Sequence, residues 1–124
     1  MKPATVIAAL LISLIICGSA GAQATTGQQI QDKCKALVNQ NSSFSGGFCA
    51  GFIDGVINSQ WMWEASDKFH KQSHFLSLCL PQEGTNGQYL QVFLKYLDDH
   101  PEELHKPAAL LLVESLAKAF PCGK

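Results

Sequence analysis

Residues 48–63, FCAGFIDGVINSQWMW, carry the clearest structural pattern in the chain. Their apolar side chains recur at spacings of three and four residues, the period of an α-helix that is buried along one face. A helix is therefore expected over about residues 48–69. Gly51 and Gly55 lie beside the apolar stripe, and glycine lowers helix propensity, so we expect them to permit close approach of another helix. The stripe consists of Cys49, Phe52, Ile53, Val56, Ile57, Gln60 and Trp63.

Three further helices are expected around this one, over about residues 28–39, 86–98 and 107–120. The polar, glycine-containing segment 41–47 separates the first helix from the second. Thr85 and Gln88 have the spacing of a capping box, which opens the third helix at about Asn86. Pro101 ends that helix, because it disfavours helical geometry at His100.

No run alternates with the two-residue period of a strand. The sequence therefore predicts an all-α domain over residues 25–124, a compact up-and-down bundle of four to five helices.

The first 24 residues have the form of a secretory signal peptide. Lys2 provides the positive charge, and residues 6–16 (VIAALLISLII) form the apolar region. The small residues that follow offer two cleavage sites, one after Ala22 and one after Ala24. The apolar run is shorter than the roughly 20 residues that a membrane helix needs. Lipidation of Cys17 is disfavoured because Ile16 precedes it where a small residue is required. We therefore expect an exported mature chain without a membrane anchor.

Four cysteines remain after the leader, and an even number in a small exported chain indicates a disulfide framework. No C-x-x-C pair points to a redox site or a zinc site. In an up-and-down bundle, the upper end of the first helix lies beside the start of the second, and the third helix begins near the end of the fourth. This topology predicts two bridges, Cys34–Cys49 and Cys79–Cys122.

Composition argues against two classes of partner, nucleic acids and anionic membranes. The 124 residues have a formal net charge of −1 and contain no arginine. Nucleic-acid binding depends on arginine clusters or basic stripes, and binding to anionic membranes on polybasic segments. A partner of either kind is therefore not expected.

Candidate catalytic residues are sparse. His70 and His74 are four residues apart, as in some helical metal sites, but no third ligand lies nearby in the sequence, so we expect two solvated histidines. The acid pairs 98–99 and 102–103 fit solvated helix ends better than an acid–base dyad. Asp54 lies among apolar residues and either points outward or accepts a buried hydrogen bond. No catalytic residue, metal or cofactor is expected.

The densest aromatic segment surrounds Trp61 and Trp63, which cannot share one helix face because they are two residues apart. Exposed tryptophan is typical of protein interfaces. The alternative is that both side chains pack under the long connection that follows. The candidate residues for contact with a protein partner are Trp61, Trp63, Glu64, Lys68, His70 and His74.

Five segments in order resemble one protein family. They are residues 49–55 (CAGFIDG), 79–81 (CLP), 88–101 (QYLQVFLKYLDDHP), 105–108 (HKPA) and 117–122 (AKAFPC). Together they resemble the Rap/Tai family of small periplasmic immunity proteins associated with type VI secretion in Gram-negative bacteria.

The resemblance implies a compact helical protein, often a homodimer, that binds a toxic peptidoglycan amidase and occludes its active-site cleft without performing a reaction. Two other hypotheses remain open: a periplasmic acid-stress chaperone, and an enzyme or metal carrier that uses His70 and His74.

Overall fold

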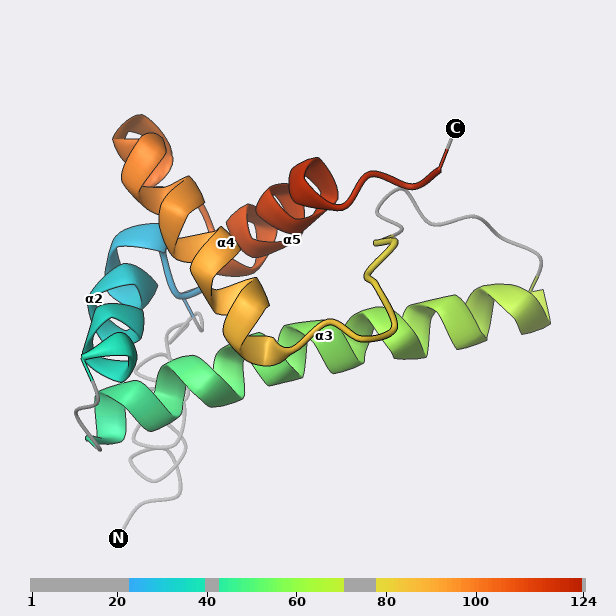
Figure 1. The fold of residues 1–124 in the computed structure, drawn as a ribbon, viewed down its shortest axis with the longest axis horizontal. Helices are drawn as coiled ribbons and strands as arrows, with labels where there is room; N and C mark the ends of the chain where they lie inside the picture. The colour runs from blue at the N-terminus through green and yellow to red at the C-terminus, as the bar shows by residue number, and fades with distance from the viewer. Residues whose placement is uncertain (1–22, 40–42, 71–77, 124) are drawn as a thin grey trace, which may run out of the picture.

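The computed structural model describes residues 23–39, 43–70 and 78–123, without the side chains of residues 63, 64 and 66–70. Within these residues the secondary structure is helical, apart from one isolated bridge. Helix α3 is the longest, and α2, α4 and α5 lie on one side of it (Figure 1). The all-α prediction is confirmed. The elements are α2 (Gly27–Val38), α3 (Phe44–His70), α4 (Asn86–Asp99), the short 3-10 helix η1 (Pro101–Glu103) and α5 (Ala108–Ala119).

Side-chain caps explain where two of the helices begin. The Thr26 hydroxyl accepts a hydrogen bond from the Gln29 backbone N–H, and the Gln29 side chain accepts one from the Thr26 N–H. Thr85 and Gln88 form the same reciprocal pair at the start of α4. Each pair satisfies backbone donors that the first helical turn would otherwise leave without partners. The predicted start of the third helix at Asn86 is therefore confirmed.

The second predicted helix begins earlier than expected, at Phe44 rather than at about Phe48. The Ser43 hydroxyl accepts a hydrogen bond from the Gly46 N–H, and the Ser43 carbonyl accepts one from the Gly47 N–H. Serine at this position stabilises a helix start enough to offset the poor helix propensity of two glycines. The loop expected over residues 41–47 was thus predicted too long.

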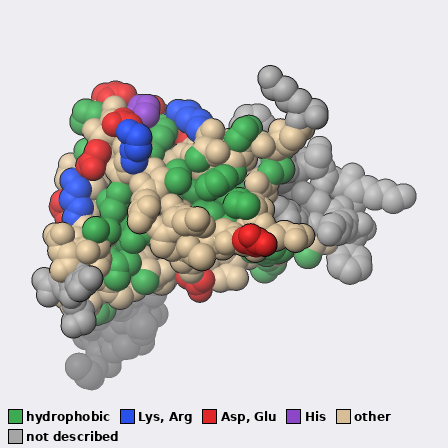
Figure 2. All heavy atoms as spheres, viewed as in Figure 1, with side chains coloured by type: hydrophobic (Ala, Val, Ile, Leu, Met, Phe, Trp, Pro, Cys, Tyr) green, Lys and Arg blue, Asp and Glu red, His purple; other side chains and the backbone are tan. Residues whose placement is uncertain are grey.

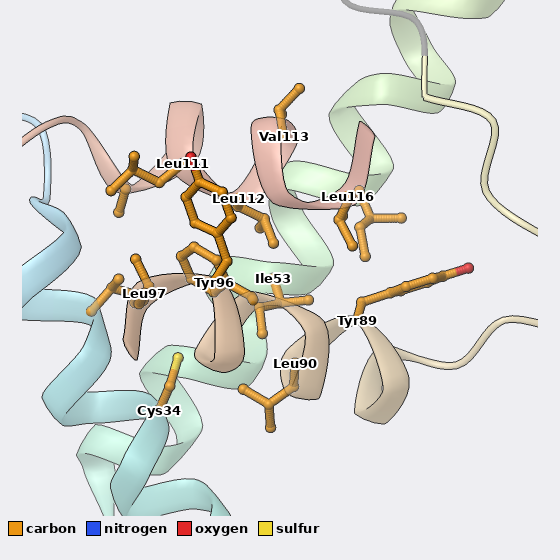
Figure 3. Packing of buried hydrophobic residues seen from close by; sticks show 14 of the residues in the cluster. Cys34, Ile53, Tyr89, Leu90, Tyr96, Leu97, Leu111, Leu112, Val113 and Leu116 are labelled. Carbon is orange, nitrogen blue, oxygen red and sulfur yellow. The ribbon is translucent and has the colours of Figure 1, made fainter. Parts of the chain in front are cut away.

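The core lies where α2, α4 and α5 meet the first half of α3. Figure 3 shows Ile53 of α3 among buried side chains of α4 and α5, which include Tyr96, Leu112 and Leu116. Burial of each such side chain contributes about 1.5–3 kcal/mol. The largest fully buried side chains are Phe93, Ile30, Ile53, Leu97, Leu111, Leu112 and Leu116.

Both predicted disulfides are confirmed, and they differ in environment. Cys34–Cys49 joins α2 to the first turns of α3, and both residues are completely buried. Cys79–Cys122 joins the segment before α4 to the segment after α5, and both residues are exposed. The first bridge is therefore part of the core, whereas the second fastens the C-terminal segment to the surface.

A backbone clamp holds the start of α2 against the turn before α5. The Gly27 N–H donates to the Lys106 carbonyl over 3.0 Å, and the Ala108 N–H donates to the Thr25 carbonyl over 2.7 Å. A Cβ atom at Gly27 would lie 2.6 Å from Leu111 Cδ1 and 3.1 Å from the Leu104 backbone. Only glycine fits this close approach without displacing a neighbour.

Gly27→Ala is expected to lower the free energy of unfolding by about 1–3 kcal/mol, because the added methyl group overpacks the clamp. Urea denaturation followed by circular dichroism measures the change. Gly87→Ala is the matched control: it also lies in a first helical turn, and its nearest neighbour would be 3.8 Å away. Equal free energies of unfolding for the two variants would show that the backbone clamp accommodates the methyl group at position 27 without loss of stability.

The expectation that Gly51 and Gly55 serve a close helix contact is wrong within this chain. Both are exposed, and no atom of the described residues outside their own helix backbone lies within 4 Å of where a Cβ would stand. The other helices pack on the opposite face of α3, around Ile53. The helix propensity lost at these glycines is therefore not offset by any packing inside the described fold.

Candidate functional site

Trp61 lies at the edge of a pocket on the second half of α3. Its side chain is 61% exposed, far more than a packed core tryptophan. The pocket has a volume of about 310 Å³ and lies between α3 and the segment that leads into α4. Among the residues that the structure describes, its lining carries no formal charge. The residues that line it are Gln60, Trp61, Leu78, Cys79, Leu80 and Gln82.

The far wall of this pocket is held in place by several contacts. Leu78 is buried in the core, and the neighbouring Cys79 is bonded to Cys122. Beyond them, the Gly84 N–H and the Tyr89 hydroxyl both donate to the Pro81 carbonyl, over 2.9 and 3.4 Å. A wall fixed in this way keeps its shape when a partner binds, which lowers the entropy cost of association.

The amphipathic lining determines what the pocket can hold. Trp61, Leu78 and Leu80 offer apolar surface, while the carboxamides of Gln60 and Gln82 can each donate and accept hydrogen bonds. This combination suits an apolar side chain together with the peptide groups beside it. Exposed aromatic side chains of this kind are enriched among the residues that dominate the binding energy of protein interfaces.

The structure tests the predicted contact residues unevenly. Trp61 is exposed, so the alternative that both tryptophans are buried is wrong for this residue. Trp63, Glu64, Lys68 and His70 lie on the last turns of α3, but their side chains are outside the description, and His74 lies outside the described residues altogether. The contribution of these five residues stays a prediction.

Sequence reasoning missed the far wall of the pocket, formed by residues 78–82. The Cys79–Cys122 bridge was predicted, but nothing local indicated that this segment would return to α3 at Trp61. The sequence feature that could have indicated this wall is Leu78. It is an apolar residue next to a cysteine predicted to be bridged, so its burial could have been expected to hold this segment against the core.

Charged side chains gather at the other end of the molecule, near the end of α4 (Figure 2). Tyr96 is the centre of this cluster. Its hydroxyl donates to Glu103 Oε2 over 2.7 Å, lies 3.4 Å from Glu114 Oε2 and accepts from Lys118 Nζ over 3.2 Å. The His100 ring stacks on the Tyr96 ring at 4.1 Å. The cluster joins η1, α4 and α5.

The contacts of this cluster shift the pKa values of its members. Hydrogen bonds from Lys106 and Tyr96 lower the pKa of the Glu103 carboxyl. The hydrogen bond between Lys106 and Glu103 also raises the pKa of the Lys106 ammonium group. Burial, together with the hydrogen bond to Glu103, raises the pKa of the Tyr96 hydroxyl. Glu103 is therefore held as a carboxylate in the folded protein.

Glu103→Gln is expected to flatten the loss of stability in acid. The carboxyl pKa is lower in the folded than in the unfolded state, so the wild-type protein gains stability above the unfolded value of about 4.3 and loses it as the pH falls through the folded value. Thermal midpoints between pH 2.5 and 7 measure this. The control, Glu83→Gln, removes an exposed carboxylate outside the cluster. Parallel profiles for the wild type and Glu103→Gln would contradict the assignment.

The predicted acid pairs form structural contacts. Asp98 accepts hydrogen bonds from Gln31 and Lys35, which joins α4 to α2, and Asp99 pairs with Lys95 on its own helix. Asp54 is exposed and accepts a hydrogen bond from Asn86, so it does not form a buried contact. Among the described residues no three His, Cys, Asp or Glu side chains are grouped as metal ligands.

Comparison with known proteins identifies the family. A family model described as Rap1a immunity proteins matches residues 26–122, nearly the whole chain after the predicted leader. The chain belongs to this family. Comparisons with curated proteins and with solved structures found no match.

The match agrees with the resemblance seen in the sequence and covers both bridges of this Rap1a-family protein. An immunity protein acts by binding a protein effector, so membership implies a protein partner. None of the described helices of this family member is long and apolar enough to cross a membrane.

Proposed function

We propose that this protein is a periplasmic immunity protein that binds a type VI secreted peptidoglycan amidase and blocks its active-site cleft, so that the producing cell is protected. The observation that carries the proposal is the family match over residues 26–122. The protein acts by occupying the cleft and performs no reaction of its own.

The Trp61 pocket is the proposed contact surface for the amidase. It combines an exposed aromatic side chain, apolar walls and a bridged, rigid rim, which are properties of interface centres. The last turns of α3 extend this surface, and we include Trp63, Glu64, Lys68, His70 and His74 as contacts.

Location in the periplasm rests on two features. Residues 1–24 have the pattern of a cleaved signal peptide, and the fold contains two disulfides, which persist in oxidising compartments. The bacterial cell wall, the substrate of the amidase, lies in the same compartment. The mature protein in this proposal begins after Ala22 or Ala24.

A titration of amidase activity tests the proposal. Purified mature protein is added to the peptidoglycan amidase encoded beside its gene, or to a panel of such amidases, and release of peptide from peptidoglycan is followed. Inhibition that is complete at a stoichiometric ratio supports the immunity function. A folded protein that inhibits none of the amidases, yet prevents aggregation of unfolded proteins near pH 3, would favour the chaperone hypothesis.

We also propose that the mature protein is a homodimer. The apolar side chains of Phe44 and Met62 on α3, which are 86% and 64% exposed, support this.

A further inference from the structure

The two disulfides differ in how readily a reductant can reach them. Cys34 and Cys49 have no exposed surface, because both lie in the core where α2 meets α3. Cys79 and Cys122 are both exposed, and neither belongs to a helix. Thiol–disulfide exchange requires that a thiolate reach a sulfur atom of the bridge, so exposed bridges are the labile ones. Of the two, Cys79–Cys122 is therefore the bridge that can exchange while the protein stays folded.

The exposed bridge lies at the Trp61 pocket. Cys79 is one of the residues that line this pocket, and it stands between Leu78 and Leu80 in the far wall. The wall runs over the second half of α3, and the bridge ties it to the segment that follows α5 (Figure 1). The redox state of the bridge thus acts on the surface that we propose for the amidase, at one of its own lining residues.

The bridge also supports the wall indirectly, through two aromatic side chains. The ring of Phe120, which follows α5, contacts the Tyr89 ring edge to face, with the ring centroids 5.8 Å apart. The Tyr89 hydroxyl donates to the Pro81 carbonyl of the wall over 3.4 Å, which is long for such a hydrogen bond. Because Cys122 is two residues beyond Phe120, the bridge helps to hold this ring against Tyr89. Opening the bridge therefore loosens a weak hydrogen bond of the wall together with its covalent tie.

The core does not depend on the exposed bridge. The largest fully buried side chains, among them Ile53, Phe93 and Leu111, all lie in the helices, whereas this bridge joins two segments outside them. Opening it leaves the contacts between the helices in place. The expected effect is a local loosening of the wall rather than unfolding of the protein.

We propose that Cys79–Cys122 is a redox site that controls the Trp61 pocket. The bridged form binds the effector, and reduction by a dithiol protein of the C-x-x-C type loosens the wall and weakens binding. The buried Cys34–Cys49 bridge keeps the core folded in both forms. The proposal rests on the effector function proposed above and adds its regulation. The two bridges thereby have separate roles, one in folding and one in binding.

Opening the bridge is a two-electron reduction by the dithiol. One thiolate of the dithiol attacks a sulfur of the bridge, which forms a mixed disulfide and releases the other cysteine as a thiolate that takes up a proton. The second thiolate of the dithiol then attacks the mixed disulfide. This step closes the disulfide of the reductant and releases the second cysteine, which is protonated in turn. Both electrons and both protons come from the dithiol, which ends oxidised.

Stepwise reduction of the mature full chain with dithiothreitol tests which bridge exchanges. Free thiols are trapped with iodoacetamide and identified by mass spectrometry, while circular dichroism follows the helices. Cys79 and Cys122 are expected to be labelled at a dithiothreitol concentration about tenfold lower than Cys34 and Cys49, with the helix signal unchanged. Simultaneous labelling of all four cysteines would overturn the proposal, as would loss of the helix signal when Cys79 is first labelled.

Hydrogen exchange measures whether the wall responds to the bridge. The Gly84 N–H donates to the Pro81 carbonyl, and the Phe120 N–H donates to the Leu116 carbonyl, so each amide reports on one side of the bridge. In the selectively reduced protein, peptides that contain Gly84 and Phe120 are expected to exchange about tenfold faster, whereas peptides of α2 are unchanged. Exchange that is the same in the bridged and the reduced protein would contradict control of the pocket by this bridge.

The amidase titration measures the effect on function. Cys79→Ala/Cys122→Ala is expected to raise the inhibition constant about tenfold or more, because the loosened wall has to be ordered when the effector binds. This variant needs no reductant, so the amidase itself is not exposed to one. The matched control Gly123→Ala changes the same segment but retains the bridge, and its Cβ would meet open space among the described residues. It is expected to inhibit as the wild type does.

The outcomes separate this proposal from the immunity function. A bridged wild type that inhibits the amidase, together with a Cys79→Ala/Cys122→Ala variant that inhibits equally well, would leave immunity standing and overturn the redox control. A bridged wild type that inhibits no amidase would remove the immunity function. Selective labelling and faster exchange of the wall would then still support a redox site at the pocket.

Discussion

Replacing Trp61 with alanine is expected to weaken inhibition of the cognate amidase about 30-fold or more, while the fold remains intact. An exposed tryptophan at the edge of an apolar pocket is the kind of side chain that contributes 2 kcal/mol or more to an interface. Because most of its surface already faces solvent, its removal leaves no cavity in the core. The inhibition constant of the variant measures the effect, and its thermal midpoint verifies the fold.

Leu110→Ala is the matched control for this variant. Leu110 is also apolar and exposed, but it lies on α5, outside the Trp61 pocket. The control is expected to inhibit as the wild type does. Equal inhibition by Trp61→Ala and the wild type would place the effector surface elsewhere, even if immunity itself is established.

Loss of the buried disulfide is expected to have the largest effect on stability. The double variant Cys34→Ala/Cys49→Ala should lower the free energy of unfolding by about 3 kcal/mol or more, because it frees a closed loop and also removes buried sulfur contacts. In a domain of this size the thermal midpoint falls by about 4–8 °C for each kcal/mol. Calorimetry of the mature protein measures the shift.

The other bridge provides the comparison. Cys79–Cys122 closes the longer loop, 43 residues apart in sequence against 15, so chain entropy alone would make its loss the more costly. We expect the opposite order for Cys79→Ala/Cys122→Ala. Both cysteines are exposed, and without the bridge the C-terminal segment gains freedom in the folded state too. A larger loss for this variant would show that loop entropy dominates.

Local patterns were enough to predict the elements of the fold. The repeat of three and four residues identified α3, and the Thr85–Gln88 pair placed the start of α4, because a capping box needs only neighbouring residues. The disulfide pairing followed from helix order, since the ends of consecutive helices in a bundle meet. The start of α3 was missed because Ser43 and its hydrogen bonds outweighed the low propensity of the glycines.

The candidate site was predicted only in part. Trp61 was singled out from composition, but its exposure and the pocket beside it depend on where residues 78–82 return to α3, which no periodicity encodes. The same holds for Glu103, an apparently solvated acid in the sequence that becomes a partner of Tyr96.

Three properties of this protein could be read from the chain alone: its helical class, its two bridges and its family. Each of these properties depends on the types of residues and on their spacing along the chain, which do not change with the packing around them. Packing decided the rest. Gly27 is closely confined and Gly51 is open to solvent, although both are glycines in helices, because Leu111 lies against the first and nothing described lies against the second. The identity of a residue limits its conformations and chemistry, but only its neighbours in space determine whether it serves the core, a pocket or a partner.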